Sequence, residues 1–353
     1  MDKKESFYWD LVKGLAIFLM LWGHCIQYCA QEAAGYLTDI VFKTIYTFHM
    51  PLFMLVSGYL FSYSFRKRSM EELLPHRIQG MLQPIVMATI LNNVLMLVPT
   101  FVLSDRVDVL FGSLFMGISN DLWFLWAVLY CSLVVGVSCK LTDRPWIQLG
   151  LLLAGIGFIL LTPQWNMTLF MYPYFVAGFF CGLYRKQAMQ LYKLLRYPAW
   201  ILFPIMVAYY EPKHYIYITP MFSEELGLSA SLEIALFRGV IGFAGSIWLL
   251  SVAELLTGVG NRVPVAKAFL RKLSCLGRNS LQIYCLSLSL LSGYLPHLYR
   301  KATELAGGNP FAQNGVLFDF LFTPILAAVW AVMLYYAVLL LKKWKLHKLI
   351  FGR

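Results

Sequence analysis

Residues 8–29, which read YWDLVKGLAIFLMLWGHCIQYC, decide the fold class of this chain. The stretch contains only two carboxylate or amine side chains, those of Asp10 and Lys13. A helix needs about 20 predominantly apolar residues to cross a bilayer, so this stretch is long enough for one crossing. It is too long for the core of a signal peptide, and we therefore expect it to be retained as an anchor.

Comparable apolar runs, separated by short polar breaks, recur along the whole chain. Their lengths predict a single all-α transmembrane domain over residues 1–353, built as a bundle of about ten helices. The expected spans lie near 8–29, 40–63, 78–103, 121–139, 146–162, 168–184, 195–210, 235–257, 279–295 and 316–341.

The composition agrees with a membrane protein and argues against a soluble enzyme. Hydrophobic residues make up 59% of the chain and charged residues 13%, with a mean hydropathy of +0.66. Soluble domains are typically about 45–50% apolar and about 25% charged. The seven cysteines show no metal-ligand spacing, and we interpret them as packing residues. No metal site is expected.

The net charge of +11 comes from 29 Lys and Arg residues against 18 Asp and Glu residues. If the N-terminus is cytoplasmic, the inner segments hold 22 of the basic residues and the outer segments hold six, with Lys13 inside the first span. Cytoplasmic loops of membrane proteins carry such an excess of positive charge. The sequence therefore predicts that both termini are cytoplasmic, and it gives no reason to expect a nucleic-acid partner.

Three ionisable side chains share one face of the first span. On a helical wheel Asp10, Lys13 and His24 fall within about 60° of one another, and about 16 Å separates Lys13 from His24 along the axis. Ionisable groups inside a bilayer are costly, and they mark function by default. Three plainer roles stay open: Asp10 as a helix cap, Lys13 reaching toward the headgroups, and His24 in a helix–helix hydrogen bond.

The second span carries a further histidine. His49 lies about midway along it, and Pro51 is expected to disrupt the helix and free a backbone carbonyl. His24 and His49 are thus expected at similar depth, where they can face one cavity. A neutral imidazole can take a proton from a hydroxyl near pH 7, as acyl transfer to an alcohol requires. From the residues alone we expect a membrane bundle with a polar cavity that contains histidine.

Four motifs resemble those of the acyltransferase family 3 membrane proteins. Residues 10–17, DLVKGLAI, followed by His24, resemble the opening of that family, whose signature is a basic residue, ten intervening residues and a histidine. Residues 48–59, FHMPLFMLVSGY, resemble its second-span motif, especially that of the sugar O-acetyltransferase branch. Residues 121–125, DLWFL, and 276–284, LGRNSLQIY, are similar to two further stretches, and the resemblance runs from about residue 7 to residue 340.

The resemblance implies transfer of an acyl group, usually acetyl, from cytoplasmic acetyl-CoA to a hydroxyl of a surface polysaccharide or lipid-linked sugar, in the bacterial inner membrane. It also implies that His24 is the essential histidine and that Lys13 helps to hold the donor. We expect His24 to act as general base and His49 to orient the acceptor or stabilise charge. Asp10 is the third candidate catalytic residue. The candidates for attracting the anionic CoA phosphates are Lys13, Arg66, Arg77 and Arg278.

One departure from the family pattern and several alternatives stay open. Many members have a histidine shortly after the Ile-Tyr of the ninth span, where this chain has Cys285-Leu286-Ser287. A succinyl or longer donor stays open, because a sequence does not size a pocket. The competing function is a transporter or flippase that moves a lipid-linked or polar substrate without chemistry. A purely structural membrane protein would leave the buried histidine and lysine unexplained.

Overall fold

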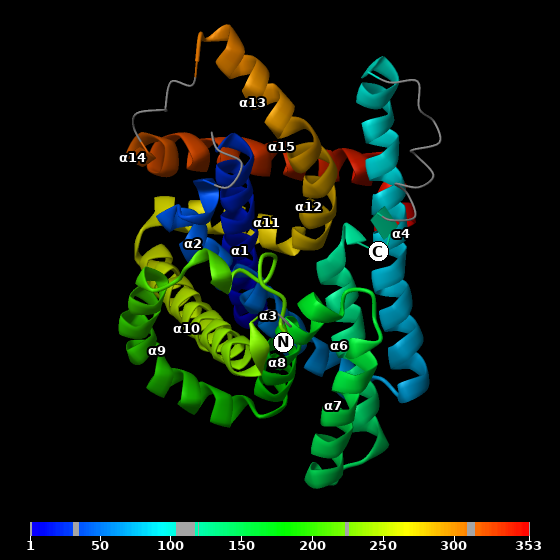
Figure 1. Ribbon diagram of the computed structural model, residues 1–353. Coiled ribbons are helices and arrows are strands. Elements are labelled where there is room, and N and C mark those ends of the chain that lie inside the picture. Colours follow the sequence, from blue (N-terminus) through cyan, green and yellow to red (C-terminus); the bar gives the residue numbers. More distant parts are fainter. Residues whose placement is uncertain are drawn as a thin grey trace.

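The computed structural model describes residues 2–30, 35–103, 117–118, 120–222, 226–308 and 315–352. Helices account for most of these residues, and none of those described forms a β-strand (Figure 1). The predicted all-α class is therefore confirmed. Arg106 and Arg353, which the charge count includes, lie outside the described residues.

Long helices with short connections make up the fold. Its first part contains α1 (Lys3–Cys29), α2 (Ile40–Tyr46), α3 (His49–Lys67), α4 (Met70–Leu103), α6 (Trp123–Leu141), α7 (Pro145–Leu160) and α8 (Trp165–Leu183). Its second part contains α9 (Arg185–Ala208), α10 (Gly227–Arg262), α11 (Pro264–Arg278), α12 (Ser280–Ser287), α13 (Gly293–Leu305), α14 (Gly315–Leu317), α15 (Thr323–Lys343) and α16 (Leu346–Phe351). Two π-helical segments, η3 (Leu288–Ser292) and η4 (Phe318–Phe322), join α12 to α13 and α14 to α15.

Eight helical segments within the described residues are long and apolar enough to cross a membrane. They are α1, Ile40–Lys67, Met70–Leu95, α6, α8, α9, α10 and Gly315–Lys343. The expected span at 146–162 forms α7, which is apolar but only 16 residues long. The expected span at 279–295 is divided among α12, η3 and α13 and is not one of the eight. An all-α integral membrane protein is thus confirmed, whereas the count of ten spans and the cytoplasmic termini stay predictions.

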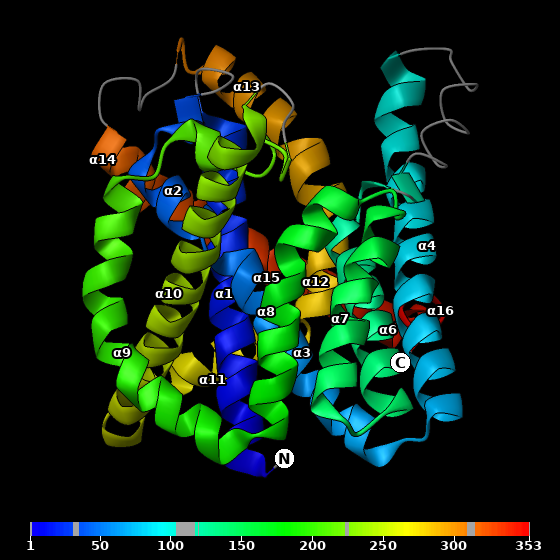
Figure 2. The same ribbon diagram turned by 60° about the horizontal axis from the view of Figure 1, so that its bottom comes forward.

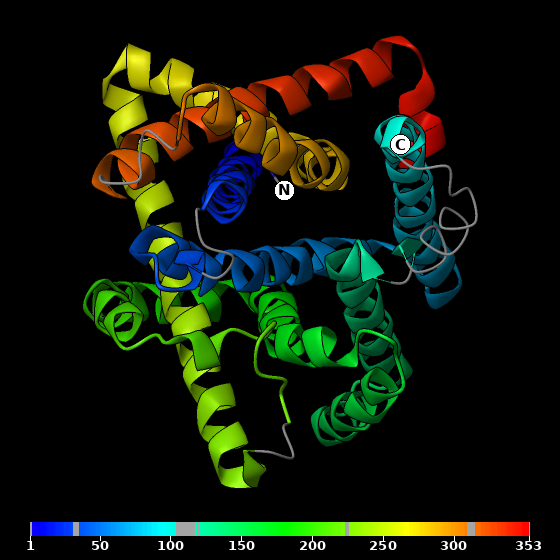
Figure 3. The same ribbon diagram turned by 45° about the horizontal axis from the view of Figure 1, so that its top comes forward.

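The N-terminal stretch that decides the fold class, α1, lies inside the bundle. It contacts α2, α3, α10, α11, α12, α13 and α15, and Figure 3 shows it enclosed by neighbouring helices. Asp2 caps its first turn, because the side chain accepts a hydrogen bond of 2.7 Å from the backbone N–H of Glu5. Figure 2 places the N-terminus at one end of the bundle and α13 at the other. Because α1 contacts so many helices, most of its side chains face protein rather than lipid.

Glycines let α1 and α11 cross closely. A Cβ atom added at Gly277 would lie 1.7 Å from the carbonyl oxygen of Asp10, and one added at Gly14 would lie 2.0 Å from a carbonyl oxygen of α11. Small residues at a helix contact permit such a close approach of two backbones. The crossing brings the C-terminal end of α11, with Arg278, next to the turn of α1 that carries Lys13.

The second expected span is interrupted at Thr47 and Phe48, which separate α2 from α3. Pro51 falls in the first turn of α3, where a backbone N–H has no partner within the helix. The break predicted at Pro51 therefore occurs one turn earlier, and His49 becomes the first residue of α3.

Candidate active site

Two neighbouring cavities hold most of the predicted site residues. The first, which we call the basic cavity, has a volume of about 310 Å³, and its polar lining includes Lys13, Ser57, Ser64, Arg77, Arg278 and Ser280. The second, the histidine cavity, has a volume of about 110 Å³, and its polar lining includes His24, Tyr46, His49, Asp121, Tyr217 and Ser287. Three side chains line both cavities and are called the neck: Met20, Met50 and Tyr284.

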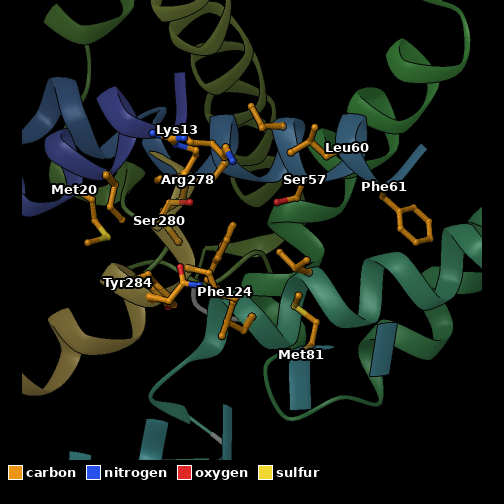
Figure 4. Close-up of a pocket in the computed structure, with 18 of the residues that line it drawn as sticks. Lys13, Met20, Ser57, Leu60, Phe61, Met81, Phe124, Arg278, Ser280 and Tyr284 are labelled. Atoms are coloured by element: carbon orange, nitrogen blue, oxygen red, sulfur yellow. The ribbon is translucent and has the colours of Figure 1, made fainter. Parts of the chain in front are cut away.

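The basic cavity gathers positive charge from three helices. Lys13 comes from α1, Arg77 from α4 and Arg278 from the end of α11. Figure 4 shows Lys13 and Arg278 next to each other, with Ser280 close by. Among the described residues that line this cavity, none is acidic. A cleft lined by one sign of charge concentrates ligands of the opposite sign, so this cavity suits a ligand that carries phosphate groups.

Asp10 contacts Lys13 but is not part of the described lining of either cavity. Its Oδ1 lies 2.9 Å from Nζ of Lys13, in an ion pair between residues one helical turn apart. The exposed fractions of the two side chains are only 15% and 20%. Within the described residues Lys13 lines the basic cavity, whereas Asp10 lines neither cavity. Asp10, expected among the catalytic residues, is thus placed where it fixes the position of a cation.

The three arginines expected near the donor have different surroundings. Arg77 lines the basic cavity, and its Nε donates a hydrogen bond of 3.0 Å to Ser132 Oγ. Arg278 also lines that cavity. Arg66 instead donates to two carbonyl oxygens at the C-terminal end of α8, at 3.2 and 2.5 Å, and it does not belong to the described lining of the basic cavity. The structure therefore brings Lys13, Arg77 and Arg278 together and leaves Arg66 apart.

A triangle of hydrogen bonds fixes the imidazole of His24. Its Nδ1 lies 3.1 Å from Gln27 Oε1 and 3.1 Å from the hydroxyl oxygen of Tyr46, and that hydroxyl donates to Gln27 Oε1 at 3.2 Å. An amide oxygen only accepts hydrogen bonds, so in the tautomer with a proton on Nδ1 the imidazole donates to Gln27, and Nε2 is the proton-accepting nitrogen. The ring of Tyr28 stacks on the imidazole with 5.5 Å between centroids. The position of His24 is thereby fixed by two polar side chains and one aromatic ring.

His49 is fixed by the break between α2 and α3. Its Nδ1 donates a hydrogen bond of 2.9 Å to the carbonyl oxygen of Ile45. In an unbroken helix that oxygen would accept from the backbone N–H of His49, so the side chain helps to satisfy the acceptor that the break releases. The Nε2 of His49 is left as an acceptor, and the residue is 3% exposed. Both histidines line the histidine cavity, as their positions in the sequence predict.

Gln27 and Tyr46 are contacts of His24 that the sequence did not predict. Gln27 follows His24 by three residues on α1, and Tyr46 precedes His49 by three residues. Residues three or four apart on a helix are neighbours on its surface. A search for polar side chains one turn from each membrane histidine would therefore have found these two positions.

Asp121 contributes a carboxyl group to the histidine cavity. It lies just before α6, within the motif at 121–125, and its Oδ2 accepts a hydrogen bond of 3.5 Å from Asn92 Nδ2. Burial raises the pKa of Asp121 above its ordinary value, and the hydrogen bond from Asn92 opposes that shift. The sequence motif marked this residue, but it did not predict that Asp121 lines the same cavity as the two histidines.

Ser287 stands in the segment where many proteins with this pattern have a histidine. It lines the histidine cavity, and its Oγ donates a hydrogen bond of 2.8 Å to the carbonyl oxygen of Tyr284. The departure from the family pattern therefore falls within the site itself. The π-helical segment η3 follows directly, and two of its leucines also line the histidine cavity. Such segments are frequent at functional sites.

The two cavities together place three basic side chains on one side of the neck and two imidazoles on the other. Within the described ranges there is no group of three or more His, Cys, Asp or Glu side chains that could hold a metal ion. The arrangement suits a reaction in which a base removes a proton from a hydroxyl while a phosphate-bearing reactant is held nearby.

Comparison with known proteins adds an independent finding. The model of the acyltransferase 3 family, described as an acyltransferase domain, matches residues 6–346. The nodulation protein NolL of Mesorhizobium japonicum is 29% identical over 176 residues, which cover 48% of this chain and 46% of that protein. The nodulation protein NolL of Sinorhizobium fredii is 34% identical over 125 residues, which cover 34% of this chain and 33% of that protein. The matched regions thus span about half or less of these curated relatives, and no solved structure matches the chain.

Proposed function

Because the chain belongs to the acyltransferase 3 family, we propose that it is an integral membrane O-acetyltransferase, which moves an acetyl group from acetyl-CoA to a hydroxyl of a surface polysaccharide or lipid-linked sugar. The observation that carries the proposal is the junction of the two cavities, with positive charge on one side of the neck and two histidines on the other. In this proposal the basic cavity opens toward the cytoplasm of a bacterium, where acetyl-CoA is found. Adjoining cavities let a donor and an acceptor from opposite faces of the inner membrane meet.

In the proposed reaction His24 is the general base. Its Nε2 takes the proton of the acceptor hydroxyl while the hydroxyl oxygen forms a bond to the carbonyl carbon of the thioester. The C–S bond then breaks, the CoA thiolate leaves, and His24 returns the proton to that sulfur. The products are an acetyl ester of the sugar and CoA in its thiol form. The Nε2 of His49 accepts a hydrogen bond from a second hydroxyl of the acceptor and so orients the sugar.

The proposal is tested with purified protein in lipid nanodiscs, labelled acetyl-CoA and glycan from cells that lack the protein. We expect label to enter the glycan in amounts equal to the CoA thiol released. A transporter or flippase, which is the competing function, would move its substrate without consuming acetyl-CoA. Movement of a lipid-linked sugar across the membrane with no release of CoA thiol would replace the proposal with that function.

Gln27 is expected to set the protonation state of His24. In Gln27→Glu a carboxylate faces Nδ1 of His24 and stabilises the imidazolium, which cannot act as a base. The acid limb of the pH–rate profile is therefore expected to move to higher pH by about one to three units. Gln190→Glu, at an exposed position on α9, is the matched control and should leave the profile in place. A profile that does not move in Gln27→Glu would mean that His24 is not the base that titrates on the acid limb.

Lys13 is expected to bind a phosphate group of the donor. In Lys13→Met the KM for acetyl-CoA should rise by about 10–100-fold, the range that a hydrogen bond to a charged group contributes, and kcat should change less. The comparison uses Lys193→Met, which removes an exposed amine from α9. Michaelis curves of CoA thiol release measure both constants. Equal KM values in the two variants would exclude a phosphate site at Lys13.

A further inference from the structure

Each of the three neck residues belongs to a different helix, and each occupies an equivalent place in its helix. On each of α1, α3 and α12, the neck residue stands in the sequence between a residue of the basic cavity and a residue of the histidine cavity. In that order the residues are Ile17, Met20 and His24 on α1, Phe53, Met50 and His49 on α3, and Ser280, Tyr284 and Ser287 on α12. On all three helices the neck residue thus stands between the two cavities.

The neck carries no charged side chain, and aromatic packing supports it on one side. Met20 is 2% exposed and Met50 is 7% exposed. The ring of Tyr284 packs edge-on against Phe124 with 5.9 Å between centroids, and Phe124 packs in the same way against Phe53 at 6.1 Å. Figure 4 shows Met20, Tyr284 and Phe124 among the side chains that line the basic cavity. The neck therefore consists of one tyrosine ring, held by packing against Phe124, and two unbranched thioether side chains.

Positive charge is confined to one side of the neck. Lys13, Arg77 and Arg278 line the basic cavity, whereas among the described residues no lysine or arginine lines the neck or the histidine cavity. An ionised group that enters the neck loses its water without meeting a cation, and such a transfer is costly. The described lining of the neck thus offers no cation to an anionic acyl group.

We propose that the neck selects the acyl group of the donor and admits only short, uncharged acyl groups such as acetyl. The inference rests on the proposed function, in which the donor phosphates lie in the basic cavity and His24 lies beyond the neck. The thioester carbonyl then reaches the acceptor hydroxyl only when the acyl group occupies the neck. Each added methylene has to fit between Met20, Met50 and the braced ring of Tyr284. A succinyl group would in addition bring a carboxylate to the neck, where no described lysine or arginine can pair with it.

The first experiment compares donors of graded size on the full-length protein in nanodiscs. Acetyl-, propionyl-, butyryl- and succinyl-CoA are supplied separately, and the release of CoA thiol gives kcat/KM for each. We expect acetyl-CoA to exceed butyryl-CoA by about tenfold or more, since one methylene in an apolar pocket changes the rate by about 10–200-fold. Succinyl-CoA has the same number of acyl carbons as butyryl-CoA, and we expect the slowest reaction with it. Equal values for acetyl- and butyryl-CoA would overturn the proposal.

The second experiment widens the neck. In Met50→Ala the ratio of butyryl to acetyl turnover should rise about tenfold, while the volume-conserving Met50→Leu should keep the wild-type ratio. Met54→Ala is the matched control, because Met54 is buried one turn further along α3 and does not belong to the described lining of either cavity. An unchanged ratio in Met50→Ala, or an equal rise in Met54→Ala, would overturn the proposal. If Met50→Ala does not fold, Met20→Ala gives the same test from α1.

The two proposals fail in different ways. If the protein is not an acyltransferase, no donor releases CoA thiol in a manner that depends on His24. If only the inference about the neck is wrong, release depends on His24 but shows no preference for chain length. If Met50→Ala turns over succinyl-CoA as fast as butyryl-CoA, the neck does not select against charge. Selection by the size of the acyl group would still stand.

Discussion

Replacement of His24 with alanine is expected to lower acetyl transfer from acetyl-CoA by about 10²–10⁴-fold, the range that a positioned acid–base group contributes. The variant removes the Nε2 atom that accepts the proton of the acceptor hydroxyl. It leaves the hydrogen bond between Tyr46 and Gln27 in place, so the surrounding structure keeps a partner for each remaining group. The rate is measured as label transferred to glycan by purified protein in nanodiscs.

His297→Ala is the matched control for this measurement. His297 is an exposed histidine on α13, and it lines neither cavity within the described residues. We expect this variant to transfer acetyl groups at the wild-type rate. A His24→Ala protein with the wild-type melting temperature and an undiminished rate would show that His24 is not the base.

A single methyl group at Gly277 is expected to force α1 away from α11. The new Cβ would lie 1.7 Å from the carbonyl oxygen of Asp10, and because that atom belongs to the backbone it cannot rotate aside. Overpacking of this kind costs about 1–3 kcal/mol, and occasionally more. Lys13 and Arg278 lie on the two sides of the contact, so the same shift should separate them. We expect a lower melting temperature in detergent and a higher KM for acetyl-CoA.

Gly150→Ala provides the comparison for this variant. Gly150 also lies within a helix, α7, but a Cβ atom added there meets nothing within 4 Å. Alanine at such a position should stabilise the helix by about 0.5–1 kcal/mol relative to glycine. Equal melting temperatures for Gly277→Ala and Gly150→Ala would mean that the crossing of α1 and α11 is looser than the distances indicate.

The amino-acid sequence predicted the features that depend on a single helix. The apolar runs predicted the all-α membrane class, because the length of a crossing is fixed by the bilayer. The spacing of Lys13 and His24 predicted that they share one face of α1, and the two residues line the two neighbouring cavities, with Met20 between them in the sequence. The position of His49 in the second span likewise predicted a cavity shared with His24.

The features that the sequence did not predict depend on which helices become neighbours. Arg66 and Arg77 both follow the second expected span, yet only Arg77 lines the basic cavity, while Arg66 lies against the end of α8. Nothing in their local sequence distinguishes them. The interruption at Thr47 was likewise assigned to Pro51, because a proline inside a helix and a proline in its first turn look alike in sequence.

The path of α1 through both cavities gives a physical meaning to the ten residues between Lys13 and His24. Eleven residue steps amount to about three complete turns, so the two side chains share the same helical phase. One inserted residue would rotate His24 by about 100° about the helix axis relative to Lys13. The imidazole would then leave the histidine cavity even though the distance along the axis hardly changed. The number of residues between Lys13 and His24 therefore sets the angle between their side chains about the helix axis, as well as the distance between them. Substitutions within this interval preserve the angle, whereas single insertions or deletions change it.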